Sequence, residues 1–183
     1  MASLTTWQID PSHSTVEFAV RHLMIATVKG RFGEFQGTVQ MDVENPATAV
    51  VDVTIPAASV DTRESQRDNH LRSPDFFDVE RFPTITFRSR RVERLRDAEL
   101  RVTGDLTIHG ITRPVALSIT PGGFTRDPWG NERAAFRAST QINREDFGLK
   151  WNQILETGGV LVGEAVRIEV EVELVRQALR VAA

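Results

Sequence analysis

The chain has no cysteine and no tyrosine among its 183 residues, and its only lysines are Lys29 and Lys150. The lack of cysteine excludes a disulfide framework, a thiol nucleophile and a cysteine-ligated zinc site. Because only two of the 22 lysines and arginines are lysines, nearly all cationic side chains are arginines. A formal net charge of −3 leaves no overall positive field that would attract nucleic acid.

Long apolar segments are also missing. No run approaches the roughly 18 apolar residues that a membrane-spanning helix needs. The first residues, MASLTTW, contain neither the positive region nor the apolar region of a secretory signal. We therefore expect a cytoplasmic protein. With 40% hydrophobic and 26% charged residues, the length predicts one globular domain over residues 1–183, with its core in residues 5–176.

Apolar and polar residues alternate with a period of two through most of the chain, which is typical of β-strands with one buried face. The clearest run lies near the end, where apolar residues occupy even positions 166–174 and Arg or Glu occupies the odd positions between them. Turn-forming residues separate about eight strands. The other runs lie at residues 16–22, 28–41, 51–55, 85–87, 100–108, 115–119 and 134–142.

Two local features interrupt this pattern. Apolar residues occupy even positions before Gly33 and odd positions after it, which predicts a β-bulge that keeps both sets on one face. Residues 61–80 form a polar insertion with a helix expected over 65–71. Ser73 and Pro74 have the pattern of a helix start and predict a second helix over 74–80.

Many antiparallel strands with one short helical insertion indicate an all-β fold, either a closed barrel or a sandwich. The number and length of the strands favour an eight-stranded antiparallel barrel. Such a barrel can hold its own side chains or one ligand. Ten phenylalanines, several of them on strand faces, suit both a filled core and an apolar tunnel for a lipid tail, and the residues alone leave both open.

Signals of catalysis or of a metal site are weak. The histidines His13, His22, His70 and His109 show no metal-type spacing, so no metal is expected. The chain has no G-x-S-x-G elbow, no Walker loop and no G-x-G-x-x-G motif. These residues do not indicate an enzyme or a cofactor.

A series of short motifs nevertheless resembles the YceI-like family of polyisoprenoid-binding proteins. The motifs occur in order across about residues 5 to 176, and the ordered set is far more specific than any single motif. They are DPSHS (10–14), FAVRH (18–22), GRFG (30–33), VDT (60–62), RDNHLRSPDFFDV (67–79), PTITF (83–87), GDLTIHGIT (104–112) and INREDFG (142–148).

The resemblance implies a lipocalin-like barrel with an extended apolar pore. Its ligand would be a long-chain isoprenoid lipid, such as a polyprenyl pyrophosphate or an isoprenoid quinone, held by a carrier or store. Fatty-acid derivatives remain open as ligands, and a homodimer is expected. Two alternatives are kept. One is an enzyme acting on the head group with His22, His70 or Asp146 as acid or base, and the other is an interaction protein with a filled barrel.

The expected ligand-binding residues fall into two groups. The apolar wall and entrance would comprise Phe18, Val20, Met24, Ile25, Phe32, Phe35, Phe76, Phe77, Phe87, Leu106, Ile108, Phe136, Ile142 and Trp151. The polar candidates for head-group contact are Arg21, His22, Asp68, His70, Asn143 and Arg144. Paired Arg and Asp side chains could equally lock the insertion onto the barrel.

Overall fold

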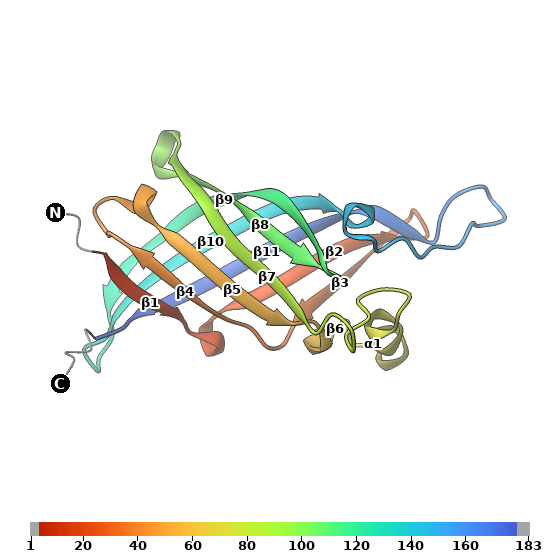
Figure 1. Ribbon diagram of the computed structural model, residues 1–183, viewed down its shortest axis with the longest axis horizontal. Coiled ribbons are helices and arrows are strands. Elements are labelled where there is room, and N and C mark those ends of the chain that lie inside the picture. Colours follow the sequence, from red (N-terminus) through yellow and green to blue (C-terminus); the bar gives the residue numbers. More distant parts are fainter. Residues whose placement is uncertain (1–3, 179–183) are drawn as a thin grey trace.

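The alternating segments form long antiparallel strands that close into a barrel in the computed structural model, which describes residues 4–178 (Figure 1). Five strands run through most of the barrel, each bonded to the next along the chain. They are β7 (Thr84–Arg94), β8 (Leu100–Ile108), β9 (Ile111–Arg126), β10 (Glu132–Asn143) and β11 (Val162–Arg176).

Three further strands are each broken into two segments. They are β1 (Thr5–Ile9) with β2 (Thr15–His22), β3 (Ala26–Phe32) with β4 (Gln36–Met41), and β5 (Val50–Pro56) with β6 (Val60–Asp61). Strand β11 pairs with both β1 and β2, which closes the barrel. The predicted eight-stranded antiparallel barrel is therefore confirmed. Short 3-10 helices lie at Pro11–His13, Pro46–Thr48, Ala57–Ser59, Arg96–Ala98 and Arg144–Phe147.

The change of parity at Gly33 marks a break in a strand and not a bulge within it. Strand β3 ends at Phe32 and β4 begins at Gln36, and both Phe32 and Phe35 are buried. The Gly33 amide donates to the Ser59 carbonyl at 2.9 Å, and Ser59 lies in the break between β5 and β6. Two adjacent strands are thus interrupted at the same level, and the apolar residues face inward on both sides of the break.

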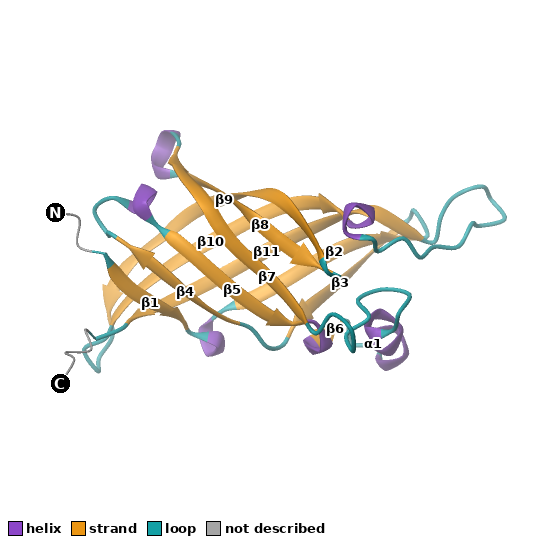
Figure 2. Ribbon diagram, viewed as in Figure 1, coloured by secondary structure: helices purple, strands orange, loops and turns teal. Residues whose placement is uncertain are grey.

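The first predicted helix is confirmed as α1 (Ser65–Arg72). The second, over residues 74–80, is wrong, because these residues form consecutive turns (Figure 2). The Phe77 amide bonds the Leu71 carbonyl at 2.9 Å, so the chain folds back along α1. This path brings Phe76 and Phe77 against the barrel, and Phe76 is buried. Burial of these two rings outweighs the local preference for a helix.

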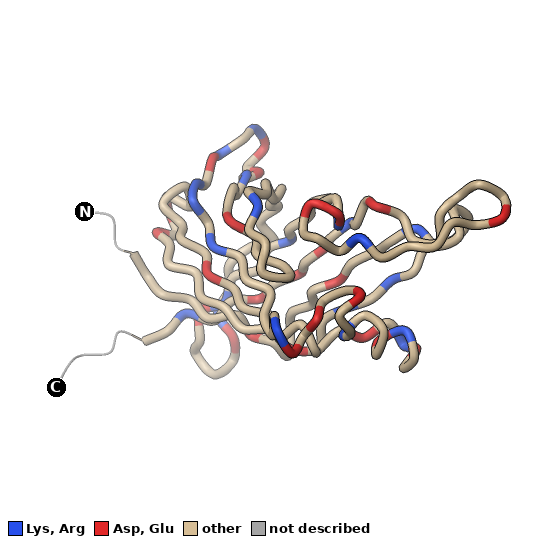
Figure 3. The backbone as a smooth tube through the Cα atoms, turned by 45° about the vertical axis from the view of Figure 1, so that its right-hand side comes forward, with Lys and Arg blue, Asp and Glu red and all other residues tan. Residues whose placement is uncertain are grey.

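Strand alternation sorts side chains between the interior and the solvent. In β8 the inward positions Leu100, Val102, Leu106 and Ile108 are buried. Positively and negatively charged residues are interspersed along the strands and loops (Figure 3). Many form cross-strand ion pairs, such as Arg88 with Asp52 at 2.7 Å. Among the residues that the structure describes, no helix is both long enough and apolar enough to cross a bilayer.

Candidate functional site

The interior of the barrel is hollow. It encloses a cavity of about 730 Å³, lined by residues of all eight strands and of α1. This volume lies within the range of about 300–1,000 Å³ that is usual for ligand sites. The barrel is therefore not filled by its own side chains, and the choice between a packed core and a tunnel is resolved in favour of a cavity.

Most of the residues expected to contact a ligand lie on the cavity wall. Their role in binding stays a prediction, but their position is the one that such a role requires. The apolar ones are Phe18, Val20, Phe32, Phe35, Phe76, Phe77, Phe87, Leu106, Ile108, Phe136, Ile142 and Trp151, and the polar ones are Arg21, His22, His70 and Arg144.

Two glycines let aromatic rings lie flat against the wall. A Cβ atom on Gly30 would come within 2.3 Å of the Phe18 ring, and one on Gly104 within 2.6 Å of the Phe87 ring. Each ring therefore covers a glycine on the neighbouring strand instead of projecting into the cavity. The glycines thus help to keep the interior open.

One end of the barrel is closed by a packed plug. Trp7, Met41, Ala134 and Leu174 are each at most 2% exposed and form a cluster of their own. The Trp7 indole donates to the Thr5 hydroxyl at 2.8 Å, so its polar atom is satisfied. A ligand could not enter here without displacing well-packed side chains.

The opposite end, beside α1, forms the mouth of the cavity. Exposed and half-buried residues of α1 and its N-terminal flank line the cavity there, among them Glu64, Gln66 and His70. The His70 ring lies edge-on to Trp151, with 4.6 Å between centroids, and Trp151 also contacts Phe76 at 5.4 Å. These three aromatic residues connect α1 to the loop before β11 and frame the entrance.

Arg144 is a buried cation at this mouth. Its Nε donates to the Gly163 carbonyl at 2.8 Å, and its Nη1 donates to the Leu149 carbonyl and to that of Trp151. Burial lowers the pKa of the guanidinium, although the charges of Glu145 and Glu164 oppose this shift. Arg144 therefore organises the loop that carries Trp151 while one side of it lines the cavity.

Four predicted residues do not line the cavity. Met24 and Ile25 are 59% and 80% exposed in the turn between β2 and β3. Asp68 accepts hydrogen bonds from the Thr62 amide and hydroxyl at 2.9 and 2.6 Å, which fixes α1 to the barrel. Asn143 accepts from the Glu145 amide and caps the 3-10 helix that follows. The two polar residues thus have structural roles, as the alternative interpretation expected for the insertion.

Sequence reasoning missed many wall residues. The inward positions of β5 and β11 were recognised as apolar strand faces but were not assigned to the site. A count of alternate positions would have found them, since they share the parity of their strands. They include Val51, Val53, Ile55, Val166, Ile168, Val170 and Val172, and other unassigned lining residues are Thr62, Arg67, Leu149 and Leu161.

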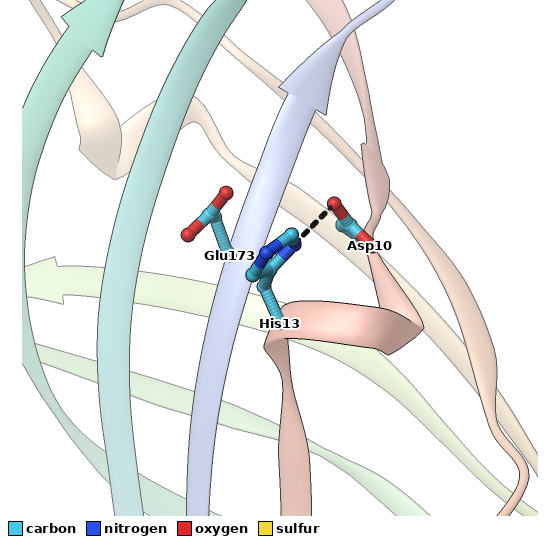
Figure 4. A group of neighbouring side chains, drawn as sticks. All are labelled: Asp10, His13 and Glu173. Atoms are coloured by element: carbon cyan, nitrogen blue, oxygen red, sulfur yellow. Dashed lines mark hydrogen bonds and ion pairs between the residues drawn. The ribbon is translucent and has the colours of Figure 1, made fainter. Parts of the chain in front are cut away.

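A group of potential metal ligands lies outside the cavity. Asp10, His13 and Glu173 bring their ligand atoms within 4.8 Å of one another (Figure 4). The Arg133 guanidinium, however, pairs with Asp10 at 2.9 Å and also with Glu173. The hydrogen bond from Ser12, followed by those from His13 and Arg133, holds the pKa of Asp10 well below its ordinary value. An arginine already compensates these carboxylates, so we assign the group a structural role.

Acid–base groups for the enzymatic alternative are not gathered at one point. His22 and His70 line the cavity, and His70 Nε2 lies 2.9 Å from Asp75. Asp146 is exposed and does not line the cavity. Two of the three candidate acid–base residues therefore lie on the cavity wall, and Asp146 does not.

Comparison with known proteins agrees with this architecture. UPF0312 protein SA2479 of Staphylococcus aureus is 38% identical over 171 residues, which cover 93% of this chain and 97% of that protein. The Campylobacter jejuni YCEI protein is 30% identical with a TM-score of 0.73, covering 86% of this chain and 90% of that one.

More distant structures share the fold. Burkholderia cenocepacia BcnA has a TM-score of 0.79 at 23% identity, over 90% of this chain and 98% of that one. A polyisoprenoid binding domain from Saccharophagus degradans has a TM-score of 0.71 at 13% identity, over 94% and 99%. The model of the YceI-like domain matches residues 7–174, so this chain belongs to the YceI-like family.

Proposed function

We propose that this protein binds a long-chain isoprenoid lipid in the barrel cavity and acts as its carrier or store. The observation that carries the proposal is an apolar cavity of about 730 Å³ that is plugged at one end and bordered by polar groups at the other. Such a shape suits an amphiphile whose tail is buried and whose head group stays near the mouth.

The energetics support a ligand with an extended apolar tail. Burial of one five-carbon isoprene unit contributes about 4 kcal/mol, at about 0.8 kcal/mol per carbon. A few units therefore supply ample gross free energy, even after the costs of ordering are subtracted. Tail length should set the affinity, while Arg144, His22 and His70 at the mouth should influence the choice of head group.

Extraction is the first test. The protein is purified without detergent, extracted with organic solvent and examined by mass spectrometry. We expect an isoprenoid, either a polyprenyl pyrophosphate or an isoprenoid quinone, in near-stoichiometric amount. Recovery of fatty-acid derivatives alone would show that the ligand is not an isoprenoid.

Melting temperature is the second test. At a ligand concentration of 100 times Kd, mass action should add about 2.7 kcal/mol, or very roughly 5–10 °C for a chain of this size. Ile108→Trp should block the cavity and abolish the shift. Thr103→Trp, on the outer face of the same strand, should keep it. The proposal would be refuted if no long-chain isoprenoid changed the melting temperature of the delipidated wild type.

Three related expectations stay predictions. The carrier should show no turnover of prenyl pyrophosphates or quinols. The cytoplasmic location is tested by fractionating cells that express the native chain, and recovery in the periplasm would contradict it. The homodimer is tested by sedimentation, and a monomer at all concentrations would contradict that.

A further inference from the structure

An apolar tip projects beyond the cavity mouth. It consists of the β2–β3 turn (Leu23, Met24 and Ile25) and the hairpin loop of residues 153–161, and both lie at the end of the barrel beside α1 (Figure 1). Ile25 is 80% exposed, and Ile154 is 86% exposed. Solvent-exposed isoleucines on adjacent loops bring no gain to the folded core, and clustered apolar surface marks an interaction site.

The turn that carries these residues is strained. Leu23 and Met24 both have positive φ angles, 52° and 64°. Turns with two such residues strongly favour Asn and Gly, because a Cβ atom crowds this backbone conformation. Here the chain places large apolar side chains at those positions and leaves them partly exposed. Neither local backbone energetics nor core packing accounts for this choice.

The two loops form one unit. The Leu23 amide donates to the Leu161 carbonyl at 2.9 Å. Met24 packs over Gly159, where a Cβ atom would lie 3.3 Å from Met24 Cγ. Ile154 and Val160 form a β-bridge across the second loop. The apolar side chains are thus presented together on paired backbone.

The backbone of the tip is largely satisfied from within. The Ile25 amide donates to the His22 carbonyl, and the Leu155 amide to the Gly159 carbonyl. Arg21 donates to the Met24 carbonyl at 2.8 Å. Internal hydrogen bonding is what a segment needs if it enters a medium that offers no water.

We propose that this apolar tip inserts into the surface of a lipid bilayer and brings the cavity mouth against it. Arg21, His22 and Val162 line the cavity and lead directly into the two loops, and Leu161 of the second loop lines it as well. A lipid leaving the bilayer would therefore meet the mouth at the base of the tip. This inference depends on the proposed function in one respect, namely that the bound lipid is taken from a membrane.

The charge of the tip points to a neutral lipid surface. Residues 23–25 and 153–161 include one charged residue, Glu156, and the whole chain has a net charge of −3. Attraction to anionic lipids would need a basic collar, and none is formed by these residues. Binding should therefore depend on apolar insertion and change little with salt.

The test is flotation with phosphatidylcholine vesicles. We expect wild type to float with the vesicles, equally at low and high salt, and to bind phosphatidylglycerol vesicles no better. The double variant Ile25→Asp with Ile154→Asp should lose at least about tenfold in partitioning, since charges replace the two apolar side chains that would enter the bilayer. Its melting temperature should match wild type.

Trp129 supplies the matched control. It is 83% exposed in the turn between β9 and β10, at the opposite end of the barrel. Trp129→Asp should float like wild type. Wild type that stays in solution, a double variant that floats normally, or loss of flotation in Trp129→Asp would each overturn the proposal.

Two further measurements separate this inference from the proposed function. Ile108→Trp, which blocks the cavity, should still float. The double variant of the tip should still bind an isoprenoid delivered from cyclodextrin. If sedimentation instead shows a dimer that Ile25→Asp dissociates, and no flotation occurs, the tip joins two copies of the chain and the proposal is wrong.

Discussion

The two ends of the barrel differ although the same strands form both. At the plugged end, Trp7 and Leu174 are at most 2% exposed and fill the space between the strands. At the mouth, an aromatic frame of Trp151, His70 and Phe76 borders a cavity and leaves polar groups at its edge. Side chains fill the space between the strands at the plugged end, whereas the aromatic frame at the other end leaves a cavity that could hold a ligand.

The difference in packing has an energetic consequence. A side chain surrounded by protein loses all its contacts on truncation, whereas one that faces a cavity has fewer contacts to lose. Substitutions at the plugged end should therefore lower stability with or without ligand. Substitutions along the cavity should depend on whether a ligand is bound.

The largest effect is expected for Trp7→Ala. It removes the centre of the plug and leaves a void, at a cost of about 3–5 kcal/mol in the free energy of unfolding. Chemical denaturation measures this cost. Trp151→Ala, at the mouth, should cost clearly less because Trp151 is only half-buried. Equal losses at both tryptophans would contradict the contrast between the two ends.

A pair of phenylalanines sharpens the comparison. Phe147 is 2% exposed and packed within the main core, whereas half-buried Phe136 lines the cavity where it meets the plug. Phe147→Ala should cost about 3–5 kcal/mol, and Phe136→Ala noticeably less in delipidated protein. Bound isoprenoid should increase the loss in free energy of unfolding caused by Phe136→Ala and leave the loss caused by Phe147→Ala unchanged. A Phe136→Ala loss as large as that of Phe147→Ala without ligand would indicate a closed interior.

Sequence alone predicted the barrel and much of its wall, because both depend on a local period of two. The alternation through β8 and β11 identified the inward positions without any knowledge of their neighbours. It could not separate a hollow interior from a packed one, since Phe136 suits either. The size of the space depends on where strands lie relative to one another, and that is a non-local property.

Errors arose where distant contacts override local preference. Ser73 and Pro74 have the pattern of a helix start, but burial of Phe76 directs the chain into turns. Asp68 was assigned to a head group, although its partner Thr62 lies six residues away and both anchor α1. Residue type alone does not show whether a carboxylate faces a ligand or a neighbouring backbone.

Glycines along the cavity offer a smaller, more local perturbation. Gly30→Ala would place a methyl group 2.3 Å from the Phe18 ring and force the ring toward the cavity. We expect a loss of about 1–3 kcal/mol in stability and weaker isoprenoid binding by titration. Gly33→Ala is the control, because its nearest contact is 3.7 Å away. If both variants bind equally well, the Phe18 ring does not shape the cavity.

The smallest effect concerns the stability of the protein in acid. It arises in the polar cluster in which Arg133 pairs with Asp10, Asp127 and Glu173. The hydrogen bond from the Asn131 side chain, together with the Arg133 guanidinium, lowers the pKa of Asp127 well below its ordinary value. The ionised carboxylate therefore stabilises the folded state fully above the unfolded pKa of about 4. That contribution is lost as the pH falls toward and through the lowered folded pKa.

Melting curves at pH 7, 5, 4, 3 and 2 test this sign with Asp127→Asn. At pH 7 the variant should melt below wild type, because its neutral amide cannot replace the carboxylate that accepts from Arg133 and from the Trp129 amide. The gap should stay constant down to about pH 4 and narrow below it, as wild type alone protonates this carboxylate. A gap that widens in acid would show that Asp127 binds its proton more readily in the folded state, contrary to the hydrogen bonds around it.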